Sequence, residues 1–460
     1  MRHFDLCVIG SGSGNSIIDE RFDDWKVALV DGQEWFGGTC LNVGCIPTKM
    51  FAYPADLAES ARHGARLGVD VGAVSVRWSD VRDRVFGRID PIVSGGEAYR
   101  RDSANVALYR ERARFVAPKV LDVGDEKFSA DRFVIAAGSR PRIPDVPGID
   151  DPALADRIHT SDSIMRLAKL PKSLIIVGGG LVAVEFAHIF AAYGTQVTLL
   201  HRGQTLLRHE DEDVSRRFTD LLSRRVVLRL GQQIASVEDA DGRIEVGTTD
   251  DDGIEYFFEA EHLLVATGRV SNSDTLDLAT TGVEVDDNGL VRVDEYQRTT
   301  ADGIWALGDV NGRGAFTHTS YNDYEIVAAN LLDNDPRRVT DRIPAYALFI
   351  DPPLGRVGMT EKEVRASGRP ALVGRMPMSR VGRARERGEM AGFMQVLVDA
   401  QTKKILGAAL LGVEGDEAVH CIMDVMYAGA PYTVIQRAVH IHPTVSELIP
   451  TLLGNLKPLA

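Results

Sequence analysis

Hydrophobic residues occur along this chain in short runs, and glycine-rich turns and amphipathic segments lie between them. Two of these runs, Asp5–Ile9 and Leu174–Val177, are followed at once by a glycine-rich segment. A further apolar run comes later in each case, at Val27–Val30 and at Gln196–Leu200. A strand, a tight turn, a helix and a second strand in this order predict parallel α/β architecture at both places.

The last part of the chain has a different pattern. The apolar runs Phe393–Val398 and Ile405–Leu411 are short and alternating, which predicts an antiparallel sheet. The segments 416–429 and 432–439 are typical of helices. Between the two glycine-rich regions, the proline-rich stretch 140–148 indicates a crossing from one domain to another.

Composition and charge narrow the class of protein. The 460 residues are 44% hydrophobic and 26% charged, which is enough for several domains with their own cores. A net charge of −14 argues against nucleic acid or an anionic membrane as the main partner.

The apolar stretch 174–193 contains three glycines and Glu185, so a strand, turn and helix fit it better than a membrane span. The N-terminus lacks the apolar core of a signal peptide, and we expect a cytoplasmic protein.

The first glycine-rich segment contains Gly10, Gly12 and Gly14. Glycines at this spacing permit a tight turn and the close approach of a pyrophosphate to a helix N-terminus. Asn15 stands where a smaller residue is usual, and we expect it to tighten the packing of helix on strand. Asp31, at the end of the next strand, is placed to bind ribose hydroxyls; the alternative is a solvated carboxylate.

The second glycine-rich segment offers Gly178, Gly180 and Ala183, and no acid follows its second strand. Arg202 and Arg208 occupy this region instead. Two guanidinium groups suit the extra phosphate of NADPH, whereas the alternative is an ordinary charged loop. Two dinucleotide sites in one chain imply two cofactors and a relay of electrons between them.

Cys40 and Cys45 are the residues that indicate the chemistry. In an ideal helix, residues five apart are separated by about 7.5 Å along the axis, so the segment must bend if the two sulfurs join. Gly44 and Pro47 permit such a bend. Two unrelated buried thiols, or half of a metal site, are the alternatives. No other cluster of cysteine or histidine supplies further metal ligands, so the pattern favours redox chemistry without a metal.

With these motifs together, the chain resembles the pyridine nucleotide–disulfide oxidoreductases of the glutathione reductase and dihydrolipoamide dehydrogenase type. The segments that carry the resemblance are 37–49, 266–272, 306–310 and 440–447. The resemblance implies an α/β protein with two Rossmann-like domains, for FAD and NADPH, and a C-terminal α+β dimerisation domain. The implied regions are 1–147 for FAD, 148–270 for NADPH, 271–340 for FAD again and 341–460 for dimerisation.

In such enzymes NADPH reduces a bound FAD, which reduces a disulfide of the protein. The resemblance implies that Cys45 faces the flavin as a thiolate and that Cys40 attacks the substrate. It also implies that Lys49 pairs with Glu185 near the flavin. The further cofactor residues that it implies are Gly38, Thr39, Gly138 and Asp309 for FAD, and Gly268 and Arg269, with Arg202 and Arg208, for NADPH.

The resemblance assigns acid–base catalysis to His442, oriented by Glu447 and acting on the active site of the other subunit of a homodimer. This role is physically sound, because a leaving thiolate needs a proton and imidazole titrates near neutral pH. A neighbouring carboxylate stabilises the imidazolium. His440, two positions earlier, is interpreted as an ordinary loop residue.

Different parts of the chain resemble different branches of the family. The segments 10–19, 85–92 and 293–299 resemble mycothione reductases, and Asn15 is regular in that branch. This likeness, over about residues 1–310, implies reduction of mycothione, the disulfide of the sugar-based thiol mycothiol.

The segments 316–321, 381–386 and 430–435 instead resemble mercuric-reductase-like flavoproteins linked to metal or oxidant stress. The alternative functions are therefore a mercuric-reductase-like or dihydrolipoamide-dehydrogenase-like flavoprotein that acts on another oxidant or a metal. An electron-transfer flavoprotein, against which the cysteine pair argues, and a redox-sensing binding protein are further alternatives.

Overall fold

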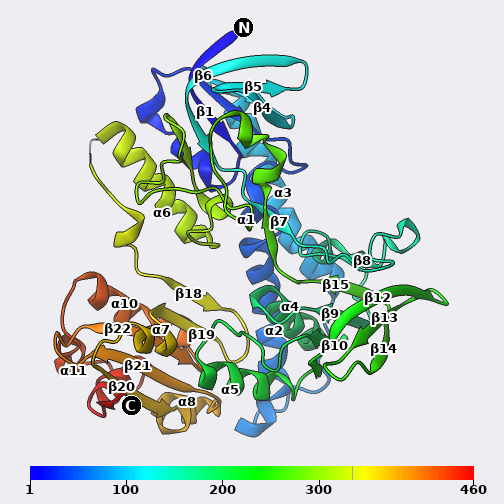
Figure 1. Cartoon of the computed structure of the whole chain (residues 1–460). Helices are drawn as coiled ribbons and strands as arrows, with labels where there is room; N and C mark the ends of the chain where they lie inside the picture. The colour runs from blue at the N-terminus through cyan, green and yellow to red at the C-terminus, as the bar shows by residue number, and fades with distance from the viewer. Residues whose placement is uncertain (334, 460) are drawn as a thin grey trace.

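The computed structural model describes residues 1–333 and 335–459 and has three domains, each built around its own sheet. In Figure 1 the first domain lies at the top, the second at the lower right and the third at the lower left. This arrangement confirms the predicted α/β class with a separate C-terminal α+β domain. Among the described residues, no helix has the length and the apolar character that crossing a membrane requires.

The first sheet has the strand order β3-β2-β1-β6-β5-β4, and β17 pairs with β6. Its strands are β1 (Arg2–Ile9), β2 (Val27–Val30), β3 (Val106–Tyr109), β4 (Ala113–Ala117), β5 (Val120–Val123), β6 (Glu126–Ile135) and β17 (Ile304–Ala306). β2, β1 and β6 are parallel. β2 is buried along its whole length and β1 is buried over Leu6–Ile9, which explains why these two strands appear in the sequence as apolar runs. β17 returns from far along the chain and runs parallel to β6.

The first glycine turn does not lead into an α-helix as expected. It leads into a five-residue 3-10 helix, Ser13–Ile17, and then into a second 3-10 turn, Glu20–Phe22. The segment between β1 and this second turn is rich in serine and glycine, which are weak helix formers. Asp19 then accepts a hydrogen bond from the backbone of Arg21, which starts the new turn.

One short helix and three longer ones lie where the first domain joins the second. They are α1 (Gly38–Asn42), α2 (Cys45–Arg62), α3 (Trp78–Asp102) and, in the second domain, α4 (Leu181–Tyr193). α2 descends from the first domain and packs along α4 (Figure 1). Phe51 of α2 stacks on Trp78 of α3 at 5.2 Å, and Trp78 lies 5.8 Å from Phe190 of α4. This buried aromatic cluster fixes the cysteine-bearing helix against the second domain.

The second sheet has the order β11-β10-β9-β15-β8, with β12-β13-β14 forming a separate antiparallel sheet. The bounds are β8 (Ile158–His159), β9 (Ser173–Val177), β10 (Gln196–His201), β11 (Val227–Leu230), β12 (Gln233–Ala240), β13 (Arg243–Thr249), β14 (Glu255–Ala260), β15 (His262–Val265) and α5 (Glu212–Leu222). The stretch 174–193 is thus β9, a turn and α4, as predicted. The two crossings between the first and second domains, β7 (Ser139–Pro141) and β16 (Arg269–Ser271), pair with each other.

The third sheet is antiparallel, with the order β18-β19-β22-β21-β20-β23. The strands are β18 (Ala345–Leu348), β19 (Leu354–Gly358), β20 (Ala371–Pro377), β21 (Phe393–Asp399), β22 (Ile405–Leu411) and β23 (Lys457–Pro458). The helices are α7 (Glu361–Ala366), α8 (Gly382–Arg387), α9 (Gly415–Ala418), α10 (His420–Tyr427), α11 (Thr433–Arg437) and α12 (Ile449–Leu453). The predicted helix 416–429 is therefore two helices. α6 (Thr317–Ala328) precedes this domain, and its first turn lies in the candidate site described next.

Candidate active site

Cys40 and Cys45 lie on two successive helices that meet at a bend. Cys40 is in α1, and Cys45 is the first residue of α2. A Cβ on Gly44 would lie 2.9 Å from the carbonyl oxygen of Thr39, so this bend requires glycine. Pro47 lies in the first turn of α2, where its missing N–H costs no helical hydrogen bond. The bend predicted from these two residues is confirmed.

The two sulfurs are free thiols that share a hydrogen bond. This bond from Cys40 is the main reason why the pKa of Cys45 falls to about 5, although burial opposes the fall. The hydroxyl of Thr317, whose Oγ1 lies 3.3 Å from Sγ of Cys45, and the charge of Lys49 act in the same direction. The N-terminus of α2 also favours an anion here. The same interaction raises the pKa of Cys40, so the reduced pair holds one negative charge, on Cys45.

Lys49 lies one helical turn after Cys45 and binds Glu185 of α4. The Lys49 Nζ is 2.9 and 2.7 Å from the two carboxylate oxygens, and the Glu185 side chain is 9% exposed. The backbone N–H of Phe349 also donates to Glu185, at 3.1 Å, and the Lys49 ammonium lies 5.0 Å from the centre of the Phe349 ring. Residues from all three domains therefore meet beside the cysteine pair.

The first glycine turn forms a close-fitting backbone cradle. A Cβ on Gly10 would overlap the carbonyl of Ala136, and a Cβ on Gly14 would overlap the Ala136 side chain. Gly10 also has a φ of +116°. A Cβ on Gly38 would lie 2.5 Å from the Cα of Gly12, so the loop before α1 touches this turn. The cradle fits the approach of a dinucleotide pyrophosphate to the backbone.

Asn15 does not tighten the helix against the strand as expected. That close contact belongs to Gly14, whereas the Oδ1 of Asn15 accepts a hydrogen bond from Nε of Arg100 at 2.7 Å. Arg100, buried in α3, also donates to the carbonyls of Asn15 and Ile18 at 3.0 and 2.8 Å. It therefore binds carbonyl groups of the short 3-10 segment. No local pattern pointed to Arg100, because it comes from a helix that is distant in the sequence.

Asp31 is not a solvated carboxylate, since it is only 5% exposed. It accepts hydrogen bonds from the backbone of Ser11 at 3.0 Å and of Gln33 at 2.8 Å, and from the Ser11 hydroxyl. Arg110 lies 3.7 Å away. Through Ser11, this carboxylate is held beside the first glycine turn, where a ribose would lie in a Rossmann-like site.

Arg269, at the start of β16, contacts a residue that was expected at FAD. Its Nε donates to the Ser139 hydroxyl at 2.7 Å, and Ser139 donates to Asp309 at 2.6 Å. Arg269 and Asp309 are 3.9 Å apart. The structure thus places Arg269 with Asp309, and Ser139, which the sequence interpretation missed, connects them.

Gly138 and Gly268 stand just before the two crossing strands β7 and β16. Both have positive φ, of +68° and +121°, which glycine adopts most readily. The Gly138 carbonyl accepts from the N–H of Asn272 at 3.1 Å, and the Gly268 carbonyl accepts from Arg142 at 2.9 Å. These two glycines therefore shape the two places where the chain crosses between the first and second domains.

The second glycine turn resembles the first in its backbone requirements. Gly178 has a φ of +146°, and a Cβ there would overlap the carbonyl of Ala266 and lie 3.2 Å from the Cβ of Ala183. Gly180 is the N-cap of α4, and a Cβ there would meet nothing within 4 Å. The N-terminus of α4 is therefore open to an anion.

Arg202 and Arg208 are exposed, and no described residue forms a hydrogen bond or an ion pair with either. Between them and the glycine turn lies His201, whose ring would be only 2.5 Å from a Cβ on Gly179. Burial, together with the two guanidinium charges, lowers the pKa of His201. Its Nε2 is buried without a partner in the described structure. Two uncompensated cations and an orphaned ring nitrogen fit an anionic group such as a nucleotide phosphate.

His442 and Glu447 lie close together, with 2.9 Å between His442 Nδ1 and Glu447 Oε2. The His442 side chain is 81% exposed, so its Nε2 is free to face another molecule. Within one chain, no described hydrogen bond joins His442 to either cysteine of the pair. His440 has only a weak contact, of 3.4 Å, with the carbonyl of Ala438.

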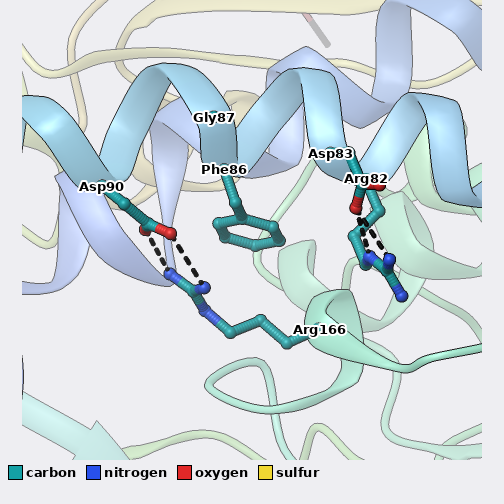
Figure 2. Close-up of a pocket in the computed structure, with 6 residues that line it drawn as sticks. All are labelled: Arg82, Asp83, Phe86, Gly87, Asp90 and Arg166. Carbon is teal, nitrogen blue, oxygen red and sulfur yellow. Dashed lines mark hydrogen bonds and ion pairs between the residues drawn. The ribbon is translucent and has the colours of Figure 1, made fainter.

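A surface hollow along α3 contains none of the predicted site residues. Figure 2 shows Arg166 reaching across the ring of Phe86 to Asp90, with 3.8 Å from the Arg166 guanidinium to the ring centre and 2.8 Å between the charged groups. Arg166 pairs with Asp90, although the Nε of Arg166 has no hydrogen-bond partner among the described residues. The hollow is lined by no cysteine, serine, threonine, lysine or histidine. No group of three potential metal ligands occurs in the part of the chain that the structure describes.

Comparison with known proteins gives a consistent family. Residues 4–323 match the pyridine nucleotide-disulphide oxidoreductase model, and residues 344–453 match the dimerisation domain of the same family. Mycothione reductase of Mycobacterium tuberculosis is 41% identical over 99% of this chain and 100% of its own length. This match therefore includes the C-terminal domain. The probable oxidoreductase RclA of Escherichia coli is 30% identical over 99% of this chain and 100% of its own length.

A solved structure described as the Cu(II) complex of the HOCl-induced flavoprotein disulfide reductase RclA from Escherichia coli is also similar. It has a TM-score of 0.87 and 30% identity, and the likeness covers 99% of both chains. The family resemblance inferred from the motifs is confirmed. The chain belongs to the pyridine nucleotide-disulphide oxidoreductase family, as a flavoprotein disulfide oxidoreductase with a dimerisation domain.

Proposed function

We propose that this protein uses NADPH and FAD to reduce mycothione to mycothiol through a Cys40–Cys45 disulfide. The observation that carries the proposal is the thiol pair itself, which shares a hydrogen bond at the start of α2 and concentrates one negative charge on Cys45. The ion pair of Lys49 and Glu185 lies one turn away. The 41% identity to a mycothione reductase over the whole chain supports the choice of substrate.

The cofactor residues follow the two glycine turns. We assign FAD to regions 1–147 and 271–340, with Gly10, Gly12, Gly14, Asp31, Gly38, Thr39, Gly138 and Asp309 as its binding residues. We assign NADPH to region 148–270, with Gly178, Gly180, Ala183, Arg202, Arg208 and Gly268. Arg269 is assigned to the boundary between the two sites, because it binds Ser139 beside Asp309. The bound flavin would supply the transfer of two electrons from the nicotinamide to the protein disulfide.

The thiol steps follow from the charge distribution. Cys40 attacks one sulfur of the substrate disulfide and forms a mixed disulfide, while its proton passes to His442 of the second subunit and then to the departing sulfur. The Cys45 thiolate next attacks Cys40, which re-forms the protein disulfide and releases the second substrate thiolate, and His442 passes to it a proton taken up from solvent. One NADPH, one proton and one disulfide are consumed for two thiols and one NADP⁺.

Glu447 orients the imidazole in this scheme. Its carboxylate accepts from Nδ1, which leaves Nε2 as the atom that exchanges the proton. In this proposal, region 341–460 places His442 in the active site of the partner in a homodimer, and its exposure supports this role. The match of residues 344–453 to the family's dimerisation domain supports this arrangement.

The experiment that tests the proposed function is anaerobic NADPH oxidation with four candidate acceptors. Mycothione, glutathione disulfide, lipoamide and Cu(II) are supplied in turn at the same concentration. We expect the highest kcat/KM with mycothione. Turnover of another acceptor without turnover of mycothione would overturn the substrate assignment.

Reduction of a metal ion or another oxidant is the second candidate function. The relative RclA is described as a Cu(II) complex, and the specific observation here is His318. It follows Thr317 at the first turn of α6, its Nε2 donates to the carbonyl of Ala345 at 2.8 Å, and its other ring nitrogen has no hydrogen bond among the described residues. Preferential turnover of Cu(II), lost on His318→Gln, would favour this candidate.

A further inference from the structure

A buried ionic cluster joins the second domain to the third. Arg356 of β19 donates from Nε to Glu210 at 3.0 Å and from Nη2 to Asp211 at 2.8 Å. The three side chains are 2%, 1% and 4% exposed. Charges buried this deeply are tolerated only when they are paired, so the cluster holds its partners in a narrow range of positions.

The two carboxylates of this cluster end the loop that carries Arg208. The N–H of Leu207 donates to the carbonyl of Gly179 at 2.9 Å, and the N–H of Glu210 donates to the carbonyl of Leu207 at 2.8 Å. The loop is thus anchored at one point to the glycine turn of the second domain and at another to Arg356. Arg208 lies between these anchors, exposed and without a partner among the described residues.

Tyr346 of β18 touches both this cluster and the cysteine site. Its hydroxyl donates a hydrogen bond to Glu210. Its ring lies nearly parallel to that of Phe316, with an angle of 10° and 5.4 Å between ring centres. Phe316 is the N-cap residue of α6 and is followed by Thr317, whose hydroxyl contacts Cys45.

We propose that Tyr346 and Arg356 are positioning residues of the third domain that determine the preference for a 2′-phosphorylated nicotinamide dinucleotide. They hold Glu210 and thereby place Arg208 at the phosphate. The ring of Tyr346 separately holds Phe316 and so places Thr317 at the Cys45 sulfur. This inference rests on the proposed use of NADPH, and it adds a third-domain element to a site otherwise formed by the second domain.

The test separates the hydroxyl of Tyr346 from its ring. Tyr346→Phe keeps the ring but leaves a buried carboxylate oxygen of Glu210 without its donor, so the loop relaxes. We expect the KM for NADPH to rise about tenfold, while kcat and the KM for NADH stay nearly unchanged. Tyr346→Leu also removes the ring contact. In that variant we further expect the alkylation of Cys45 in the reduced protein to require a higher pH. Tyr427→Phe, at an exposed tyrosine of the same domain, is the matched control.

The measurements use the FAD-loaded enzyme, and flavin content and thermal unfolding confirm that each variant folds. If the wild-type enzyme does not prefer NADPH over NADH, the proposed cofactor is wrong. If it does, and Tyr346→Phe keeps the same ratio of KM values, or raises both KM values equally, the positioning role is wrong. Should Tyr346→Phe fail to fold, the ratio of the KM values for NADPH and NADH is measured for Glu210→Gln instead. This variant weakens the same anchor and leaves Asp211 to pair with Arg356.

Discussion

The hydroxyl of Thr317 lies 3.3 Å from the sulfur of Cys45 and joins the first turn of α6 to the first turn of α2. A hydroxyl that donates to a thiolate stabilises the charged form, which lowers the thiol pKa. We expect Thr317→Val to raise the pKa of Cys45 by about one pH unit. The pH dependence of Cys45 alkylation in the reduced enzyme, followed by peptide mass spectrometry, measures this. An unchanged midpoint would contradict it, and Thr300→Val, outside the site, is the control.

The depressed pKa of Cys45 makes the stability of the reduced enzyme depend on pH. Its thiol has a pKa of about 5 in the folded protein against an ordinary value of 9.0. A group of this kind stabilises the fold above its unfolded pKa, and the contribution is lost as pH falls toward the folded value. As the pH rises from 5 to 9, the free energy of unfolding of the reduced wild type should therefore increase relative to that of Cys45→Ser. Parallel curves for the two proteins, from denaturant titrations at each pH, would rule this out.

The ion pair of Lys49 and Glu185 should be energetically coupled. Glu185 is nearly buried, so Lys49→Met leaves its carboxylate without a cation and should lower the free energy of unfolding by about 1–3 kcal/mol. The double variant with Glu185→Gln should recover part of the loss. The exposed pair Arg216 and Glu212 of α5 is the control and should show a coupling below about 0.5 kcal/mol. Equal coupling energies in the double-mutant cycles of the two ion pairs would contradict the special environment of Lys49 and Glu185.

The sharing of active sites between subunits can be tested by complementation. Cys40→Ser and His442→Ala homodimers should both be nearly inactive. When the two chains are co-expressed in equal amounts, half of the dimers are mixed. Each mixed dimer then has one site with an intact Cys40 and an intact His442, so about a quarter of wild-type activity should return. If each chain used its own His442, no mixed dimer would be active.

Arg202 and Arg208 should determine the choice of dinucleotide. Both are exposed and unpaired among the described residues, so their replacement by alanine removes charge without leaving another charge unsatisfied. We expect the KM for NADPH to rise at least about tenfold, because charge-assisted hydrogen bonds to a phosphate are lost. The KM for NADH should change little. Arg224→Ala, an exposed arginine of the same domain, is the control, and an equal effect on both dinucleotides would oppose the assignment.

Several strands could be predicted because they are buried along almost their whole length. The predicted bounds agree with those of β2, in the parallel part of the first sheet, and with those of β22, in the antiparallel third sheet. The long helix α3 was not predicted, since it contains Gly87, Pro91 and a pair of glycines that usually end a helix. Its apolar face packs in the core formed with α2 and α4, and this tertiary packing overrides the weak local preference.

In the candidate site, too, some features could be predicted from the sequence and others could not. The cysteines and the two glycine turns are local motifs, so their spacing alone indicated their chemistry. Contacts between distant parts of the chain were missed, such as Arg100 on Asn15 and Tyr346 on Glu210. The link from Arg269 through Ser139, on the paired crossing strand, to Asp309 was missed as well. No sequence pattern encodes partners that only the tertiary fold brings together.

The most direct test of the central claim is the turnover of mycothione by Cys40→Ser and wild-type enzyme under anaerobic conditions with NADPH. Cys40 is the proposed attacking thiol, and serine preserves its size but does not form a disulfide. We predict steady NADPH oxidation, with two mycothiol molecules formed per NADPH, in the wild type and almost none in the variant. Turnover of mycothione by Cys40→Ser at the wild-type rate would contradict the disulfide mechanism.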